Sequence, residues 1–281
     1  MSLSLIGIAL LAALLHASWN ALAKSGGRAE FSIASYQLLG AVLCVFLLPL
    51  VPLPHVDSWP YIFASVVIHN IYYFTLAAAY RAGDLSQVYP LFRGLAPVLV
   101  TVGAIWFADE WLPAGSLAGI VLISIGLMSL TFLGRHLGHI PRTALIWGLV
   151  TSVLIGAYTI TDGLGVRLAG DPYSYIVWLF IFEPVPICLI LLMRQRREFL
   201  NFVQSNRGRI LMGGTFSSAA YALVIYAMSF GAMGLVSSLR ESSVIFAAII
   251  GSIFLKEPFG RQRIIAATLV AAGIIMMRLF A

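Results

Sequence analysis

The chain contains one pattern twice, and this repeat limits the folds open to it. Segment 92–130 begins FRGLAPVLVTVGAIWFADEWL, and segment 239–277 begins LRESSVIFAAIIGSIFLKEPF. A constant offset of 147 residues relates the two segments, and it pairs Arg93 with Arg240 and Glu110 with Glu257. A repeat of about half the chain in so apolar a sequence is typical of membrane transporters built from two homologous bundles.

The composition predicts an integral membrane protein with no water-soluble domain. Hydrophobic residues make up 60% of the chain and charged residues 10%, whereas soluble domains carry about 25% charged residues. The net charge of +6 does not indicate a nucleic-acid partner, because the basic residues lie in short loops between apolar runs. The expected partners are the lipid bilayer and a small molecule. Cys44 and Cys188 lie inside apolar runs and are expected to pack there.

The fold class predicted is all-α, with ten transmembrane helices. Each apolar run is near the ~20 residues needed to cross a bilayer core, and proline residues separate several of them. Five crossings per half is an odd number, so the second half is expected to be inverted relative to the first. The halves are residues 1–137 and 138–281, forming one integral domain around a central cavity, and 194–208 is expected to be a solvated connector. The helices are expected at 4–24, 32–51, 59–81, 86–108, 113–133, 145–168, 173–193, 209–230, 235–255 and 261–279.

The basic residues also predict an orientation. Of the 17 Lys and Arg residues, Arg93 and Arg240 lie within helices, and only Arg167 and Arg278 lie on the side that holds both termini. The other thirteen lie on the opposite side. The positive-inside rule therefore places that opposite side in the cytoplasm and both termini outside. The membrane expected is the bacterial inner membrane.

Charged residues within the helices are the first candidates for function, because a charge in mid-membrane costs about 2.5–3.5 kcal/mol on insertion scales and needs a partner or water. A rise of about 1.5 Å per residue from the terminus-bearing face gives depths of roughly 8–9 Å for Asp162, Arg240 and Glu241, and roughly 22 Å for Arg93. The same count gives roughly 13–15 Å for Glu183, His69, Tyr158 and Tyr221.

Polar and aromatic residues recur at helical spacing on five of the expected helices, which predicts a common aqueous cavity. We interpret Asp162, Glu183 and Glu241 as proton- or ion-coupling residues. Glu183 precedes Pro184 and Pro186, which should break the helix beside it. The substrate-binding residues expected are His16, Trp19, Asn20, His69, Tyr73, Tyr89, Arg93, Tyr158, Tyr221 and Arg240. We expect no metal site and no cofactor.

Structural explanations remain open for several of these residues. His16 and Trp19 could form ordinary interhelical hydrogen bonds, and His69 could be a satisfied core histidine. Asp162 and Arg240, at equal depth, could form a purely structural ion pair. Glu110 and Glu257 lie at helix ends and are interpreted as gate or loop-anchoring residues. Gly115 and Gly119 could form a homodimer face, but packing within a monomer is favoured.

The chain resembles the drug/metabolite transporter superfamily, specifically its ten-helix EamA-type permeases. The matching features are the HASWNALAK run at 16–24, the paired Glu110 and Glu257, and a fifth helix rich in small residues in each half. The resemblance implies secondary transport, often export, of small metabolites through a central cavity. It also implies termini in the cytosol, in conflict with the charge count.

The leading hypothesis is a secondary active or facilitative transporter of a small zwitterionic or amphipathic metabolite, such as an amino acid or a related organic acid. Arg93 and Arg240 would hold its anionic end, and a buried carboxylate its amine or a coupling proton. An alternative is an organic-cation or drug exporter, which would need a dominant acidic site. A polytopic membrane enzyme is a remote alternative, because the chain lacks H-E-x-x-H, G-x-S-x-G and clustered metal ligands. The protein is therefore not expected to be an enzyme.

Overall fold

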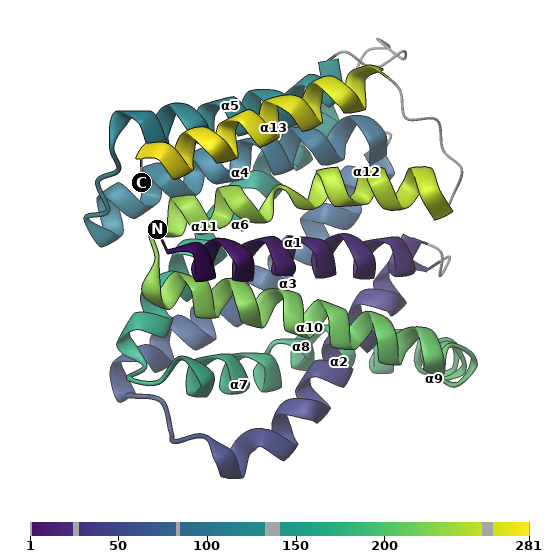
Figure 1. The fold of residues 1–281 in the computed structure, drawn as a ribbon. Coiled ribbons are helices and arrows are strands. Elements are labelled where there is room, and N and C mark those ends of the chain that lie inside the picture. The colour runs from purple at the N-terminus through teal and green to yellow at the C-terminus, as the bar shows by residue number, and fades with distance from the viewer. Residues whose placement is uncertain (1, 25–27, 83–84, 133–140, 255–260, 281) are drawn as a thin grey trace.

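The computed structural model describes residues 2–24, 28–82, 85–132, 141–254 and 261–280. Over these residues the chain forms α-helices and two short 3₁₀ turns, with no strand (Figure 1). The first half contains α1 (Leu3–Lys24), α2 (Ala29–Leu47), η1 (Leu48–Leu50), η2 (Val56–Ser58), α3 (Trp59–Ala82), α4 (Leu85–Ala108) and α5 (Ala114–Phe132). The second half contains α6 (Arg142–Leu168), α7 (Pro172–Phe182), α8 (Pro184–Arg194), α9 (Arg196–Ser205), α10 (Arg207–Phe230), α11 (Met233–Arg240), α12 (Ser243–Phe254) and α13 (Arg261–Phe280).

Two of the expected helices are interrupted. The break between α7 and α8 falls at Glu183, as predicted, because Pro184 and Pro186 have no backbone N–H to continue the ladder. The uninterrupted helix predicted at 235–255 is wrong, since α11 ends at Arg240 and α12 begins at Ser243. Over the break, Glu241 N bonds Ser238 O and Ser242 N bonds Leu239 O, both at 3.1 Å. Each bond joins residues three apart, as in a 3₁₀ turn, and not four apart as in an α-helix. The Ser242 hydroxyl also donates to Leu239 O at 2.7 Å.

The connector expected at 194–208 contains a helix, α9. Its Phe199 is buried against Phe31 of α2, with ring centroids 5.6 Å apart. Arg28 at the start of α2 pairs with Glu198. Phe202 makes the same ring contact with Phe31 at 5.6 Å, so apolar side chains and an ion pair anchor the connector to the bundle.

Eight stretches of the described residues are long and apolar enough to cross a membrane. They correspond to α1, α2, α4, α5, α6, α7 with α8, α10 and α13. α11 and α12, with 8 and 12 residues, are each too short to meet this criterion alone. α3 is long enough, with 24 residues, but it is not among the eight stretches, and polar residues such as His69 and Asn70 lie near its middle. The expected count of ten crossings is thus not established by length and composition.

The outer surface of the bundle is apolar, as lipid contact requires. Large apolar side chains in the middle of several helices are more than half exposed, including Val67 at 57%, Ile125 at 54% and Val153 at 56%. Asp162 and Glu241, in contrast, have no exposed surface. Apolar side chains outside and charged side chains inside are the reverse of a water-soluble protein. The chain is an integral membrane protein.

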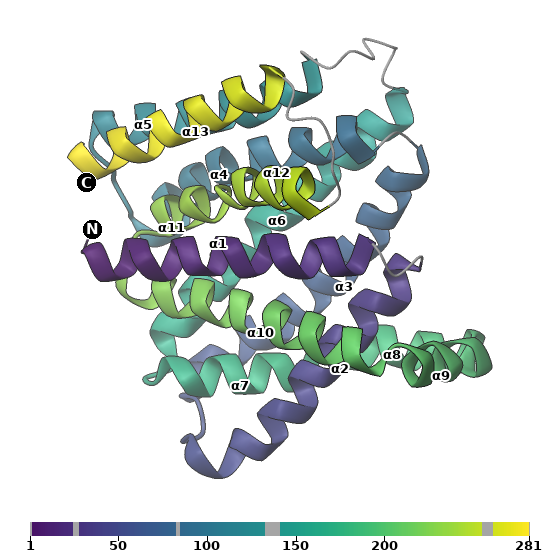
Figure 2. The same cartoon turned by 45° about the vertical axis from the view of Figure 1, so that its right-hand side comes forward.

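α5 and α13 form a close antiparallel pair along one side of the bundle (Figures 1 and 2). A Cβ atom added at Gly119 would lie 2.7 Å from the carbonyl oxygen of Gly273, so the two backbones nearly touch. Gly115 faces Phe280 and Gly126 faces Ala266 O and Leu269, in opposite order along the two helices. Gly115 and Gly119 are therefore used for packing within the chain, and not left as a free face.

The remaining helices pack in pairs around the interior. α1 lies along α10, α3 lies along α6, and α4 contacts α5, α6 and α11. The described ends of α1 and α13, next to the chain termini, lie on the same side of the bundle (Figure 1). The helix breaks at Glu183 and at Glu241 both occur at buried positions, and these breaks position the candidate site.

Candidate functional site

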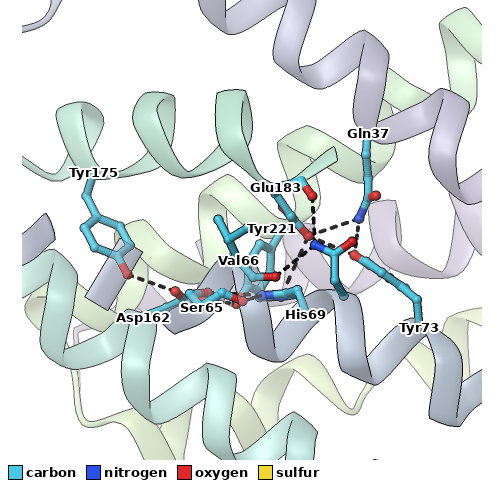
Figure 3. A network of polar contacts seen from close by, with 10 residues as sticks. Gln37, Ser65, Val66, His69, Tyr73, Asp162, Tyr175, Glu183 and Tyr221 are labelled. Carbon is cyan, nitrogen blue, oxygen red and sulfur yellow. Dashed lines mark hydrogen bonds and ion pairs between the residues drawn. The ribbon is translucent and has the colours of Figure 1, made fainter. Parts of the chain in front are cut away.

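Glu183, at the break between α7 and α8, is the centre of a buried polar network (Figure 3). Its Oε1 accepts hydrogen bonds from the Tyr73 hydroxyl at 2.8 Å and from Gln37 Nε2 at 3.0 Å. Asn70 Nδ2 donates to the Glu183 carbonyl oxygen at 3.1 Å. Side chains from α2 and α3 therefore hold both the carboxylate and the backbone of the broken helix.

Asp162, on α6, is a second buried carboxylate, and both of its oxygens are hydrogen-bonded. The Tyr175 hydroxyl donates to Oδ1 at 2.9 Å, and the Tyr221 hydroxyl donates to Oδ2. These tyrosines come from α7 and α10. Because two hydroxyl donors satisfy it, Asp162 can remain buried without a cationic partner.

His69, on α3, lies between the two carboxylates (Figure 3). Its Nδ1 lies 3.0 Å from the carbonyl oxygen of Ser65 and 3.1 Å from the Ser65 hydroxyl. A proton on Nδ1 suits both contacts, because the carbonyl can only accept and the hydroxyl can accept as well. Nε2 then faces Glu183, 3.9 Å from Oε1. The His69 ring stacks on Tyr158 at a centroid distance of 4.0 Å. We call Asp162, Glu183 and His69 the acidic cluster.

A second group, the basic cluster, consists of Arg93 on α4 with Arg240 and Glu241 at the α11–α12 break. Arg93 Nε lies 2.7 Å from Glu241 Oε2, and Arg240 Nε lies 3.6 Å from Glu241 Oε1. Both distances are within ion-pair range, although neither N–H is aligned for a hydrogen bond with the carboxylate. Arg93 also donates to the Ser243 hydroxyl at 3.5 Å, and its guanidinium lies 6.0 Å from the Tyr89 ring.

The basic cluster corrects two predictions from helix depth. Arg93 and Glu241 were expected at different depths but are in contact. The depth count assumed straight helices, whereas α4 contains Pro90 and Pro97 and the 235–255 helix is broken. The structural ion pair considered for Asp162 and Arg240 is not among the ion pairs of the described residues, where Asp162 contacts tyrosines and Arg240 contacts Glu241.

Tyr158 connects the two clusters. Its ring stacks on His69 of the acidic cluster and lies 5.9 Å from the Tyr221 ring. It also packs in one hydrophobic cluster with Tyr89, whose ring lies 6.0 Å from the Arg93 guanidinium of the basic cluster. Acidic and basic groups thus meet across one aromatic side chain in the interior of the bundle.

The expected site residues of α1 contribute less directly. His16 is within electrostatic range of Arg93 and Arg240, and its ring makes an edge contact with Trp19 at 5.2 Å. Trp19 in turn contacts Tyr36 of α2. Asn20 donates to the backbone oxygen of His16 at 2.7 Å, a bond within α1. No described contact joins Trp19 or Asn20 to the acidic cluster.

Glu110, after the end of α4, joins several helix ends on the side of the chain termini. One carboxylate oxygen accepts from the backbone N–H of Met233 at 2.8 Å, at the start of α11. The other pairs with Arg167 at the end of α6, and Arg167 also donates to Met228 O at 3.0 Å and Gly231 O at 2.8 Å. This geometry fits an anchor or a gate. Its repeat equivalent, Glu257, lies outside the described residues.

The sequence analysis did not predict several residues that contact the site residues. These are Gln37, Ser65, Asn70, Arg167 as the partner of Glu110, and Tyr175. Gln37 is an amide inside an apolar helix and could have been noticed for its cost in lipid. Asn70 directly follows His69 and could have been noticed in the same way. The sequence does not distinguish Tyr175, which is buried, from Tyr173 two residues earlier, which is 56% exposed.

Comparison with known proteins agrees with this fold. Residues 142–279 match the EamA-like transporter family. A solved crystal structure, described only as that of a protein, superposes with a TM-score of 0.78 over 100% of this chain and 98% of that one, at 17% identity. At that identity the match concerns the fold alone. No curated protein matches the sequence. The match of the C-terminal half to a family of membrane transporters is consistent with the drug/metabolite transporter superfamily.

Proposed function

We propose that the protein is a secondary active or facilitative transporter of a small zwitterionic or amphipathic metabolite, such as an amino acid or related organic acid. The observation that carries this proposal is the pair of buried clusters of opposite character, joined through Tyr158. The basic cluster would hold the carboxylate of the metabolite, and the acidic cluster its amine. A buried charge is costly in lipid unless it is paired or functional, and this chain buries five ionisable side chains in the two clusters besides His69.

The two halves, residues 1–137 and 138–281, would be inverted repeats that move about a central cavity to give alternating access. The packing supports this. α5 and α13, the last helices of the two halves, are antiparallel. In such a repeat, α1 corresponds to α6 and α3 corresponds to α10. The contact of α1 with α10 should then have an equivalent in a contact of α6 with α3, and both contacts are present.

The coupling residue would be Glu183 or Asp162, because Glu241 is already paired with Arg93. In the tautomer with the proton on Nδ1, His69 presents an unprotonated Nε2 to Glu183 Oε1 at 3.9 Å, so a proton added to either group would convert a repulsive contact into an attractive one. Glu183 is the stronger candidate, since Asp162 has each of its oxygens satisfied by a tyrosine.

The test is substrate flux in proteoliposomes, with the substrate first chosen from a metabolite panel by thermal stabilisation of the purified chain. Glu183→Gln keeps the shape and the hydrogen-bond acceptor, so it should insert and fold but lose coupled flux. Arg93→Ala should lose flux as well. Arg197→Gln, an exposed arginine on α9, is the matched control. Flux at the wild-type level from both site variants would refute these assignments.

An organic-cation exporter is the second candidate. It is favoured by the aromatic surroundings of the acidic cluster, where His69, Tyr158 and Tyr221 lie within 4.0–5.9 Å of one another by ring centroid. Aromatic rings beside carboxylates suit hydrophobic cations. Inhibition of flux by such cations, with no inhibition by amino acids, would select this candidate over the zwitterion.

A further inference from the structure

The α11–α12 break gathers more positive than negative charge. Arg93 and Arg240 each carry one positive charge, and Glu241 supplies one negative charge between them. Arg93 and Arg240 are each 3% exposed and Glu241 is fully buried. His16, the other titratable group nearby on α1, cannot offset this excess, because an imidazole is neutral or positive. One buried positive charge is therefore not balanced within the described cluster.

Two nitrogen donors of Arg240 are also unused. Its Nε and Nη2 are buried and have no hydrogen-bond partner. The Ser237 hydroxyl, one helical turn earlier on the same face of α11, is buried and unpartnered too. Buried donors of this kind are rare in native proteins and usually indicate a missing ligand or water.

The first residue of α12 adds a third favourable feature. Ser243 begins the helix, and its hydroxyl accepts from Arg93 Nη2 at 3.5 Å. α12 has 12 residues, and the N-terminus of a helix carries partial positive charge. Its first N–H groups are already used, since Val244 N bonds Glu241 O at 3.1 Å and Ile245 N bonds Ser242 O at 2.9 Å, so the helix contributes charge and not free donors. The break thus brings a helix N-terminus beside two guanidinium groups.

Glu241 is poorly held in this position. Neither of its carboxylate oxygens takes part in an aligned hydrogen bond, although Arg93 Nε is only 2.7 Å away. Its backbone is confined to the tight turn between the helices. A free carboxylate could meet Arg240 with better geometry than this tethered one.

We propose that the α11–α12 break is a binding site for a single carboxylate group and that Glu241 is its built-in competitor. The incoming carboxylate binds the free donors of Arg240 beside the positive end of α12, while Glu241 holds Arg93 in the empty site and repels a second anion. The inference rests on the proposed function, since the carboxylate would be the anionic end of the transported metabolite. It assigns Glu241 to anion selection and not to proton coupling.

The test uses the full chain in detergent, with thermal unfolding followed while sodium benzoate is titrated at constant ionic strength. Benzamide, the uncharged analogue of similar shape, is titrated in parallel. Benzoate should raise the melting temperature of the wild type, and benzamide should not. Glu241→Gln should lower the half-saturating benzoate concentration about tenfold, because it removes one negative charge a few ångströms from the ligand. Arg240→Gln should abolish the benzoate effect.

Glu241→Gln is the decisive variant, because a gain of binding cannot come from misfolding. Arg197→Gln and Glu30→Gln, both exposed substitutions, should leave the benzoate titration unchanged. Unaltered or weaker benzoate binding by Glu241→Gln overturns the proposal, as does full binding by a folded Arg240→Gln. The lack of a benzoate effect in both wild type and Glu241→Gln overturns it as well. Metabolite flux without benzoate binding would remove this inference alone, whereas benzoate binding without any flux would remove the transport proposal.

Discussion

The contact between α5 and α13 gives the sharpest test of the fold. In Gly119→Ala the new Cβ would lie 2.7 Å from Gly273 O and 2.9 Å from Met277 N. Both are backbone atoms, so a rotamer change cannot relieve the clash. The helices would have to separate by about 0.7 Å to reach an ordinary contact near 3.4 Å. Overpacking of this kind costs about 1–3 kcal/mol.

The matched control is Gly7→Ala, where an added Cβ meets nothing within 4 Å. Both substitutions gain the same helix propensity, which is worth about 0.5–1 kcal/mol for glycine to alanine. The difference between the two variants therefore isolates the cost of the close approach. At about 2–4 °C per kcal/mol for domains of this size, Gly119→Ala should melt roughly 2–12 °C below Gly7→Ala.

The assay can follow the chain's own thiols. Cys44 and Cys188 are both free and buried, so a thiol-reactive dye reports unfolding without an added label. A homodimer face would make the loss depend on protein concentration, whereas packing within one chain does not. If Gly119→Ala melts at or above Gly7→Ala, the α5–α13 contact is not as close as described.

Three further predictions follow from described contacts. Tyr175→Phe removes the donor to Asp162 Oδ1 and should cost about 1–3 kcal/mol, while Tyr173→Phe, at an exposed position, should cost almost nothing; parallel melting curves would compare them. Arg167→Gln leaves Glu110 without its cationic partner and should increase the reactivity of cysteines introduced at the ends of α6 and α11; unchanged reactivity would argue against a gate there. Of two reporter enzymes fused at residue 281, the one that is active only outside the cytoplasm should give the signal, as the Lys and Arg count predicts; a signal from the one that is active only in the cytoplasm would reverse the orientation.

Features that depend on local backbone chemistry could be predicted from the sequence. The break at Glu183 was predictable because proline removes a hydrogen-bond donor wherever it occurs. The break after Arg240 was not, because no proline marks it. The bond from the Ser242 hydroxyl to a backbone oxygen three residues earlier is no signal either, since Ser129 makes the same bond within the unbroken α5. Tyr89 and Arg93 are four residues apart in the sequence, a spacing that puts them on one helix face, and the Arg93 guanidinium does lie 6.0 Å from the Tyr89 ring.

Contacts between helices were harder to predict, because they depend on tilt and kinks that one-dimensional spacing does not contain. A straight-helix count separated Arg93 from Glu241, yet they form an ion pair. The same count suggested that Asp162 and Arg240 could pair, yet Asp162 is bound by tyrosines from α7 and α10. Sequence identified which groups are costly to bury, but the three-dimensional fold decides which neighbour offsets the cost.

The two breaks differ in a way that suggests a division of labour. Glu183 follows α7, and its Oε1 receives donors from Tyr73 and Gln37 while its carbonyl oxygen receives one from Asn70, so both of these oxygens are already hydrogen-bonded. At the α11–α12 break, donors remain unused on Arg240. A satisfied site binds no further group without losing a bond it already has, whereas an unsatisfied one gains by binding. Under the proposed function, anion capture is therefore expected to begin at Arg240. The acidic cluster would bind the amine of the ligand, or take up a proton, only by giving up a hydrogen bond that it already has.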